Sequence, residues 1–232
     1  MMMSIGENLR IIQERIRESL IKSVSPERQI DVIAVTKKVA VDQIQEAVNL
    51  GVRNVGENKV QEMLGKFDQI DGLVNWHMIG HLQRNKVKYI VDKVSLIHSV
   101  DSLPLMEEIS VRALKSGRQI DCLIQVNVSG EVSKFGIEPT ELEDLIKKSQ
   151  ELSGIRAIGL MTMAPYDDNP EKARPYFKKL NELFQLTKEK RLSSVEMKVL
   201  SMGMSNDFDV AVQEGATMVR IGSALFGSRN YA

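Results

Sequence analysis

The strongest constraint in this sequence is an eightfold alternation of short apolar runs with amphipathic segments. The runs predict eight strands, over Val32–Thr36, Arg53–Gly56, Trp76–Ile79, Leu96–Val100, Cys122–Val128, Ile155–Met163, Met197–Ser201 and Met218–Ile221. The segments between them carry apolar residues at helical spacing. Because each parallel crossover needs a helix, eight such units favour an α/β fold closed as a (β/α)8 TIM-like barrel over an open, doubly wound sheet.

An extra helix is predicted ahead of the first strand. Ser4 and Glu7 have the spacing of a capping box. Its apolar face consists of Ile5, Leu9, Ile12, Ile16 and Leu20. The chain stops too soon after the eighth strand for a full eighth helix, so we expect the N-terminal helix to cover that gap. Without a linker or a low-complexity stretch, residues 1–232 are expected to form a single domain.

Composition narrows the classes of partner and compartment. The chain has 31 Lys and Arg against 31 Asp and Glu, so its zero net charge argues against nucleic acid and membranes as partners. Cys122 is the only cysteine, which excludes an internal disulfide and a Cys-rich metal site. No apolar run is long enough to span a bilayer or resembles a signal peptide. We therefore interpret the protein as cytoplasmic.

Lys37 directly follows the first predicted strand, and the carboxyl ends of barrel strands build the active face. A lysine at the rim of an apolar wall is partly desolvated, which lowers its pKa and makes a neutral amine available. Imine formation with an aldehyde requires such an amine. The alternative is a solvated lysine at a strand end, as we expect for Lys38.

The loops after the seventh and eighth strands have the composition of a phosphate cradle, and barrels often bind phosphate there. The first reads Ser201-Met202-Gly203-Met204-Ser205-Asn206 and the second Gly222-Ser223-Ala224. Glycine lets the backbone approach an anion, while hydroxyl and free N–H groups donate hydrogen bonds. The alternative is ordinary turn chemistry, in which Ser205 caps the seventh helix.

Three further polar residues are candidates. Strand alternation turns Arg220 into the barrel, where its partner is either an inward carboxylate or a ligand acceptor. Asn58 follows the second strand and can reach a pocket or cap a helix. His77 lies on the third strand, where a lone histidine is more often a core residue. His81 and His98 are too scattered to indicate a metal site, and we expect no metal.

Ordered sequence blocks along essentially the whole chain resemble the pyridoxal phosphate homeostasis proteins, the YggS/PROSC family. The early blocks are Ala34-Val35-Thr36-Lys37, Val55-Gly56-Glu57-Asn58, Val60-Gln61-Glu62 and Trp76-His77-Met78-Ile79-Gly80. The later ones are Ser133-Lys134-Phe135-Gly136, Gly159-Leu160-Met161, Leu200-Ser201-Met202-Gly203-Met204-Ser205 and Met218-Val219-Arg220-Ile221-Gly222-Ser223. Any one block is common, but so many in order are specific.

The resemblance implies a barrel of the alanine racemase N-terminal domain type and pyridoxal 5′-phosphate (PLP) as the cofactor. It implies that Lys37 carries the cofactor as an internal aldimine, a Schiff base, and that Arg220 faces the pyridine nitrogen. The candidate cofactor-binding set is Lys37, Asn58, His77, Ser201, Met202, Ser205, Arg220, Gly222 and Ser223. Two departures are visible: Lys38-Val39-Ala40 stands where many members have x-Lys-Pro, and His81 stands where a proline is common.

We predict a non-catalytic monomer that buffers PLP or delivers it to PLP-dependent apoenzymes, in vitamin B6 and amino-acid homeostasis. One rival is a PLP-dependent amino-acid racemase of the same barrel type. Racemisation needs a proton donor and an acceptor on opposite faces of the substrate. Lys37 could serve one face, and no residue clearly serves the other. The second rival is an isomerase or aldolase that acts on a sugar phosphate with the same phosphate loops.

Overall fold

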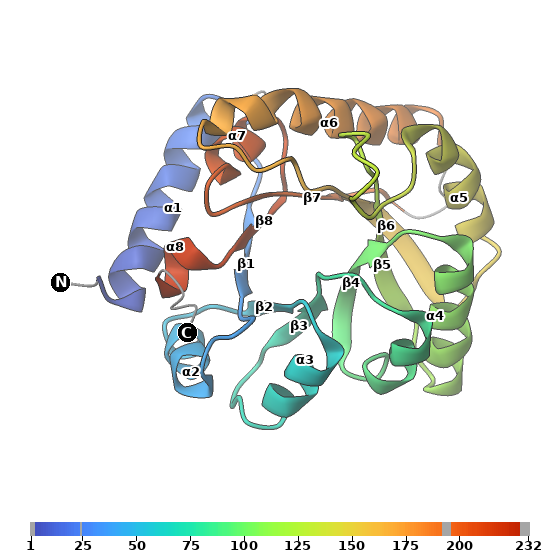
Figure 1. Cartoon of the computed structure of the whole chain (residues 1–232), viewed down its shortest axis with the longest axis horizontal. Helices are drawn as coiled ribbons and strands as arrows, with labels where there is room; N and C mark the ends of the chain where they lie inside the picture. The colour runs from blue at the N-terminus through green and yellow to red at the C-terminus, as the bar shows by residue number, and fades with distance from the viewer. Residues whose placement is uncertain (1–2, 24, 192–195, 228–232) are drawn as a thin grey trace.

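The computed structural model describes residues 3–23, 25–191 and 196–227. Within these residues eight parallel strands close into one barrel in chain order (Figure 1). The strands are β1 Asp31–Val35, β2 Asn54–Glu57, β3 Asn75–Met78, β4 Val94–Val100, β5 Ile120–Gln125, β6 Ile155–Met161, β7 Val199–Met204 and β8 Met218–Ile221. The barrel closes where β1 pairs with β8, from Asp31 opposite Met218 to Ala34 opposite Ile221. The predicted (β/α)8 barrel is confirmed.

Helices connect the strands and surround the barrel (Figure 1). The α-helices are α1 Ile5–Ile21, α2 Val41–Asn49, α3 Val60–Phe67, α4 Leu103–Lys115, α5 Leu142–Ser149, α6 Arg174–Glu189, α7 Phe208–Gln213 and α8 Ser223–Phe226. The 3-10 helices are η1 Arg84–Tyr89, η2 Pro139–Glu141 and η3 Pro170–Ala173. In the described ranges no helix has the length and apolar character needed to cross a bilayer.

The N-terminal helix α1 covers the side of the barrel beside the short helix α8 (Figure 1). Its start is the predicted capping box, in which Ser4 Oγ accepts from the Glu7 N–H and Glu7 accepts from the Ser4 N–H. Asn8 donates to the carbonyl of Leu225 in α8 at 2.9 Å. The predicted N-terminal helix is confirmed, and it packs beside α7 and α8.

Several predicted elements differ from the observed ones. The segment between the third and fourth strands was expected to be helical like the others, but only Arg84–Tyr89 is helical, as the 3-10 helix η1. The fifth and sixth strands were predicted to end at Val128 and Met163, but β5 ends at Gln125 and β6 at Met161. The seventh strand was predicted to end at Ser201, but β7 continues to Met204. A register shift between β7 and β8 accompanies this extension, and Gly203 within it has a φ of +89°. The predicted loop residues Ser201 and Met202 therefore lie inside a strand.

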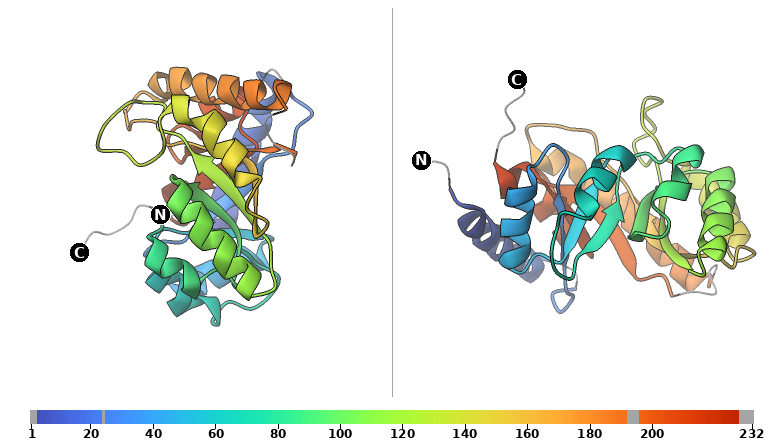
Figure 2. Two further views of the ribbon diagram at one scale, coloured as in Figure 1. Left: turned by 90° about the vertical axis from the view of Figure 1, so that its right-hand side faces the viewer. Right: turned by 90° about the horizontal axis from the view of Figure 1, so that it is seen from below.

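The core has two regions. A continuous apolar layer lies between the barrel and the helices, and a smaller set of side chains fills the barrel itself. The interior apolar clusters are Leu96, Leu123, Ile158, Met161 and Val199, and Ile33, Val35 and Ile79. The segment between β5 and η2, residues 126–138, projects away from the barrel in both views of Figure 2. The candidate site lies at the carboxyl ends of the strands.

Candidate functional site

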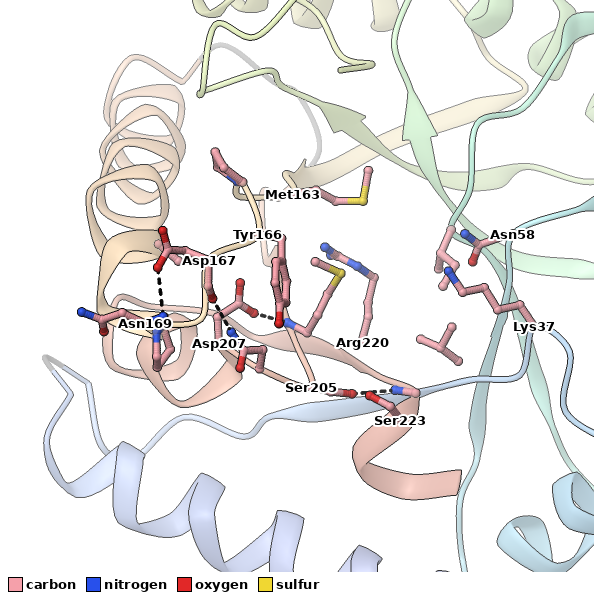
Figure 3. Close-up of a pocket in the computed structure, with 18 residues that line it drawn as sticks. Lys37, Asn58, Met163, Tyr166, Asp167, Asn169, Ser205, Asp207, Arg220 and Ser223 are labelled. Carbon is pink, nitrogen blue, oxygen red and sulfur yellow. Dashed lines mark hydrogen bonds between the residues drawn. The ribbon is translucent and has the colours of Figure 1, made fainter. Parts of the chain in front are cut away.

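A cavity of about 260 Å³ opens at the carboxyl ends of the strands, with Lys37 and Asn58 on one side and the segment after β6 on the other (Figure 3). Six of the predicted cofactor residues line it: Lys37, Asn58, Ser205, Arg220, Gly222 and Ser223. They come from the ends of β1, β2, β7 and β8. His77, Ser201 and Met202 are not among its lining residues.

The backbone on both sides of Lys37 is fixed by helix α3. The Lys66 ammonium donates to the Thr36 carbonyl at 2.7 Å, and the Lys38 N–H donates to a Glu62 carboxylate oxygen. Lys38 itself has a φ of +57°, a conformation that a side chain disfavours and that these contacts hold in place. The turn after β1 thus directs Lys37 into the cavity while its neighbours are anchored below (Figure 3).

The anchor is a buried charge cluster that sequence reasoning missed. Lys66 Nζ also donates to Glu57 Oε1 at 2.7 Å and to Glu62 Oε1 at 2.9 Å. Burial raises the pKa of Glu57, although Lys66 and Thr36 oppose the rise. Burial also acts to raise the pKa of Glu62, but the Lys38 N–H and Lys66 outweigh it and lower that pKa. The Glu62–Lys66 spacing of four residues was the only signal in the sequence.

Ser205, Gly222 and Ser223 lie together at the base of the cavity, where Ser205 and Ser223 supply the donors (Figure 3). Ser205 Oγ accepts from the N–H groups of Gly222 at 3.1 Å and Ala224 at 3.2 Å, which leaves its hydroxyl proton available. The Ser223 N–H has no hydrogen-bond partner among the described residues. The expectation that Ser205 caps the seventh helix was wrong, because Asp207 stands at that position and Ser205 instead ties the loops after β7 and β8 together.

Ser201 and Met202 lie deeper than the predicted cradle because β7 is longer than expected. The Met202 side chain is fully buried in the layer between barrel and helices. Ser201 points into the barrel, where its hydroxyl contacts Arg220 and His98. Period-two alternation explains the opposite directions of these two neighbours.

Arg220 is buried in the barrel and reaches the cavity from below (Figure 3). It donates to Ser201 Oγ at 2.6 Å and to the Thr162 carbonyl at 2.8 Å. No carboxylate of the described residues lies within ion-pair distance of it, so a structural ion pair does not account for its position. Burial lowers its pKa to about 10, against the opposing charge of Asp207, and the guanidinium stays protonated at neutral pH.

Asn58 lines the cavity and carries an unsatisfied acceptor. Its Oδ1 atom is buried and has no hydrogen-bond partner within the described part of the chain. Its alternative role as a helix cap does not hold, because Lys59 occupies the cap position of α3. A buried polar atom without a partner is costly, and a ligand donor would remove that cost. The cavity therefore combines an amine, a guanidinium, a lone acceptor and a group of hydroxyl and amide donors.

The far wall was not predicted. It consists of residues that follow β6, including Met163, Tyr166 and Asp167 (Figure 3). Asn206 donates to the Asp167 carbonyl at 2.8 Å and so joins this wall to the loop after β7. Long-range loop contacts of this kind leave no periodic signal in a sequence.

His81 lies outside the cavity. Its Nδ1 atom is 3.3 Å from an Asp101 carboxylate oxygen, and its ring stacks on Phe135 with centroids 4.0 Å apart. The histidine that replaces the common proline therefore contacts the projecting segment 126–138.

His77 and His98 form a buried pair inside the barrel, with His77 Nδ1 2.9 Å from His98 Nε2. Burial lowers the pKa of His77 to about 4. The pKa of His98 lies well below its usual value, chiefly because of burial and also because of the charges on His77 and Arg220. Both imidazoles are therefore neutral at pH 7.

This pair predicts a loss of stability in acid. The unfolded chain binds a proton at His77 near pH 6.5, whereas the folded chain binds it only near pH 4, so the free energy of unfolding falls as the pH drops through this window. For His77 alone the expected loss is about 3 kcal/mol. Urea unfolding between pH 7 and pH 4 measures it. His77→Phe should flatten the curve, and an unchanged slope in that variant would contradict the assignment.

Comparison with known proteins gives one family over the whole chain. Residues 6–230 match the family model of the alanine racemase N-terminal domain. The pyridoxal phosphate homeostasis protein of Aquifex aeolicus is 45% identical, over 99% of this chain and 100% of the relative. The protein of that name from Pasteurella multocida is 36% identical, with the same coverage.

Solved structures are similar to this chain over nearly its whole length. PipY of Synechococcus elongatus PCC7942, in a structure with PLP bound, has a TM-score of 0.83 and 30% identity, over 97% of this chain and 100% of that chain. An alanine racemase of Clostridium difficile 630 has a TM-score of 0.70 and 16% identity, which shows a shared fold. The match covers 97% of this chain but 57% of the racemase.

Proposed function

The chain belongs to the pyridoxal phosphate homeostasis protein family, and we propose that it binds PLP and carries or buffers the cofactor through Lys37. The observation that carries this proposal is the cavity itself. In it the Lys37 amine, the Arg220 guanidinium and the Ser205 and Ser223 donors lie on three different sides (Figure 3). In PLP the aldehyde and the phosphate arm are on neighbouring ring carbons and the pyridine nitrogen lies opposite the aldehyde, so an amine, a group of hydroxyl and amide donors and a guanidinium on separate sides of one cavity fit this cofactor.

The buried acceptor of Asn58 and the open donors of Arg220 support the fit of this cofactor. PLP would supply its aldehyde carbon for a reversible imine bond with a lysine. Ser205 and the Ser223 N–H would bind the phosphate, Arg220 would donate to the pyridine nitrogen, and Asn58 Oδ1 would accept from a ring substituent. The whole chain, residues 1–232, would then act as one cofactor-binding domain.

The same residues favour a carrier over a racemase. Apart from Lys37, the acid–base candidates of the lining are Tyr166, Asp167 and Asp207. Tyr166 is 78% exposed and donates to Asp168, and Asp167 pairs with Lys172 at 2.8 Å. A carboxylate oxygen of Asp207 accepts a hydrogen bond from the Met204 N–H. Each of these three groups already has a hydrogen-bond or ion-pair partner, so none is placed as a proton donor on the face opposite Lys37. Arg220 can only donate to the pyridine nitrogen, which keeps that nitrogen unprotonated and makes the ring a weak electron sink.

The proposed function predicts a coloured protein with little or no racemase activity. The purified protein should absorb in the visible range and lose that band on borohydride reduction, which a sugar-phosphate isomerase or aldolase would not do. Alanine and serine in D2O should show no α-proton exchange above a cofactor-only control, measured by proton NMR. Rapid exchange with inversion that disappears in Lys37→Ala would replace the carrier by a racemase.

Apoenzymes are the recipients that we propose for the carried cofactor, within vitamin B6 and amino-acid homeostasis. We further propose a cytoplasmic monomer that uses neither nucleic acid nor a membrane as partner. The balanced charge and the single buried Cys122 support this proposal. Size-exclusion chromatography with light scattering tests the oligomeric state, and absorbance recovery in a PLP-dependent apoenzyme tests delivery.

A further inference from the structure

A continuous line of polar groups crosses the barrel interior below the cavity. It begins at Arg220 on β8, passes through Ser201 on β7 and His98 on β4, and ends at His77 on β3. The three links measure 2.6 Å, 3.0 Å and 2.9 Å in that order. His98 and Ser201 are fully buried, and Arg220 and His77 are each 3% exposed. Bulk water therefore has little access to the hydrogen bonds of this line.

The donor and acceptor chemistry gives this line a single direction. Arginine can only donate, so Ser201 Oγ accepts from Arg220. The Ser201 proton must then go to another acceptor, and His98 Nδ1 is the one within reach among the described residues. His98 is neutral, so its proton sits on Nε2 and is donated to His77 Nδ1. His77 in turn must carry its proton on Nε2.

The reverse direction would leave a buried group unpaired. If His98 Nδ1 carried the proton, Ser201 would accept from both His98 and Arg220. Its own hydroxyl proton would then have no acceptor among the described residues, and a buried donor without a partner is disfavoured. The apolar clusters on either side of the line strengthen each hydrogen bond in it.

The far end of the line reaches the opposite mouth of the barrel. The His77 side chain borders a hollow at the amino ends of the strands, together with Asn54, Asn75 and Thr217. The His77 Nε2 proton can therefore be donated toward that mouth. The line thus joins the two ends of the barrel by hydrogen bonds alone.

We propose that His98 and His77 are positioning residues that fix the orientation of Arg220 toward the cofactor, an inference that rests on the proposed function. His98 accepts the Ser201 hydroxyl proton, and this orients a lone pair of the Ser201 oxygen toward Arg220. Two N–H groups of the guanidinium then donate to Ser201 and to the Thr162 carbonyl inside the barrel. Its remaining N–H groups stay directed at the cavity. Neither histidine touches the cavity, so both act through Ser201.

The first test uses the protein without cofactor. Long-range proton–nitrogen NMR of nitrogen-15-labelled protein at pH 7.5 shows which ring nitrogen of each histidine carries the proton. We expect His98 and His77 both in the neutral Nε2–H form, with signals assigned through His98→Asn and His77→Phe. A proton on Nδ1 of His98 would overturn the proposed direction.

The second test separates positioning from packing with two substitutions at one site. His98→Phe keeps the ring volume and loses the acceptor for Ser201. His98→Asn loses volume but keeps an acceptor oxygen near the former Nδ1. We expect PLP affinity to fall about tenfold or more in His98→Phe and to stay within about threefold of the parent in His98→Asn. Without cofactor, the melting temperature should be higher for His98→Phe than for His98→Asn.

The control is Cys122→Ala, which removes a buried polar atom of β5 that faces the helix layer and should leave affinity unchanged. Affinity that follows stability, with His98→Asn the weaker binder, would make the histidines ordinary packing residues and overturn the inference. A parent protein that binds no PLP would instead overturn the proposed function, and the NMR result would still decide the direction of the hydrogen-bond line.

Discussion

Substitution of Lys37 by alanine should abolish the covalent attachment of PLP completely. The visible band should disappear, and borohydride followed by peptide mapping should recover no labelled peptide. Some affinity should remain, because the Ser205 hydroxyl and the Ser223 N–H and hydroxyl come from different loops than Lys37 and do not depend on the amine. Three charge-assisted hydrogen bonds at about 1.5 kcal/mol each amount to roughly 4.5 kcal/mol, a Kd of about 0.5 mM.

Lys38→Ala is the matched control for this experiment. Lys38 is the next residue in the same turn and is exposed, and it is not among the residues that line the cavity. Its substitution should leave both the band and the labelled Lys37 peptide in place. A label on Lys38, or on any other lysine of the parent protein, would overturn the assignment of Lys37.

Ser205→Ala should weaken PLP binding about tenfold to a hundredfold, because one hydrogen bond to a charged group contributes about 1.5–3 kcal/mol. The same substitution removes the acceptor for the Gly222 and Ala224 N–H groups, which loosens the junction between two loops. Because pyridoxal lacks the phosphate, its affinity should change much less. The ratio of the two affinities, measured by titration of absorbance, isolates the contact with the phosphate.

Ser99→Ala supplies the comparison for stability. Ser99 is a buried serine near the end of β4 that does not line the cavity, and its hydroxyl donates to the Gly80 carbonyl at 2.6 Å. It should cost stability without changing the ratio of pyridoxal to PLP affinity. If Ser205→Ala left that ratio at the parent value, the phosphate would bind elsewhere.

Much of the fold followed from local patterns in the sequence. Apolar periodicity predicted each strand, since burial of one face repeats with the period of the element that forms it, and the spacing of Ser4 and Glu7 predicted the capping box. The position of Lys37 at a strand end predicted its place at the cavity, because all parallel strands of a barrel end at one face. Ser205, Arg220, Gly222 and Ser223 reached the same cavity for that reason.

The tertiary structure alone decided how these residues are supported. Lys66 reads as a surface lysine of an amphipathic helix, yet it is buried and anchors the turn that carries Lys37. His77 and His98 looked like isolated histidines, and closure of the barrel brings them into line with Ser201 and Arg220. Because β7 runs on to Met204, Ser201 lies inside the strand and belongs to that line and not to the expected cradle. Local periodicity determines which face a side chain occupies, whereas its partner across the barrel depends on strand register and closure, which bring together residues such as His98 and Ser201, 103 positions apart.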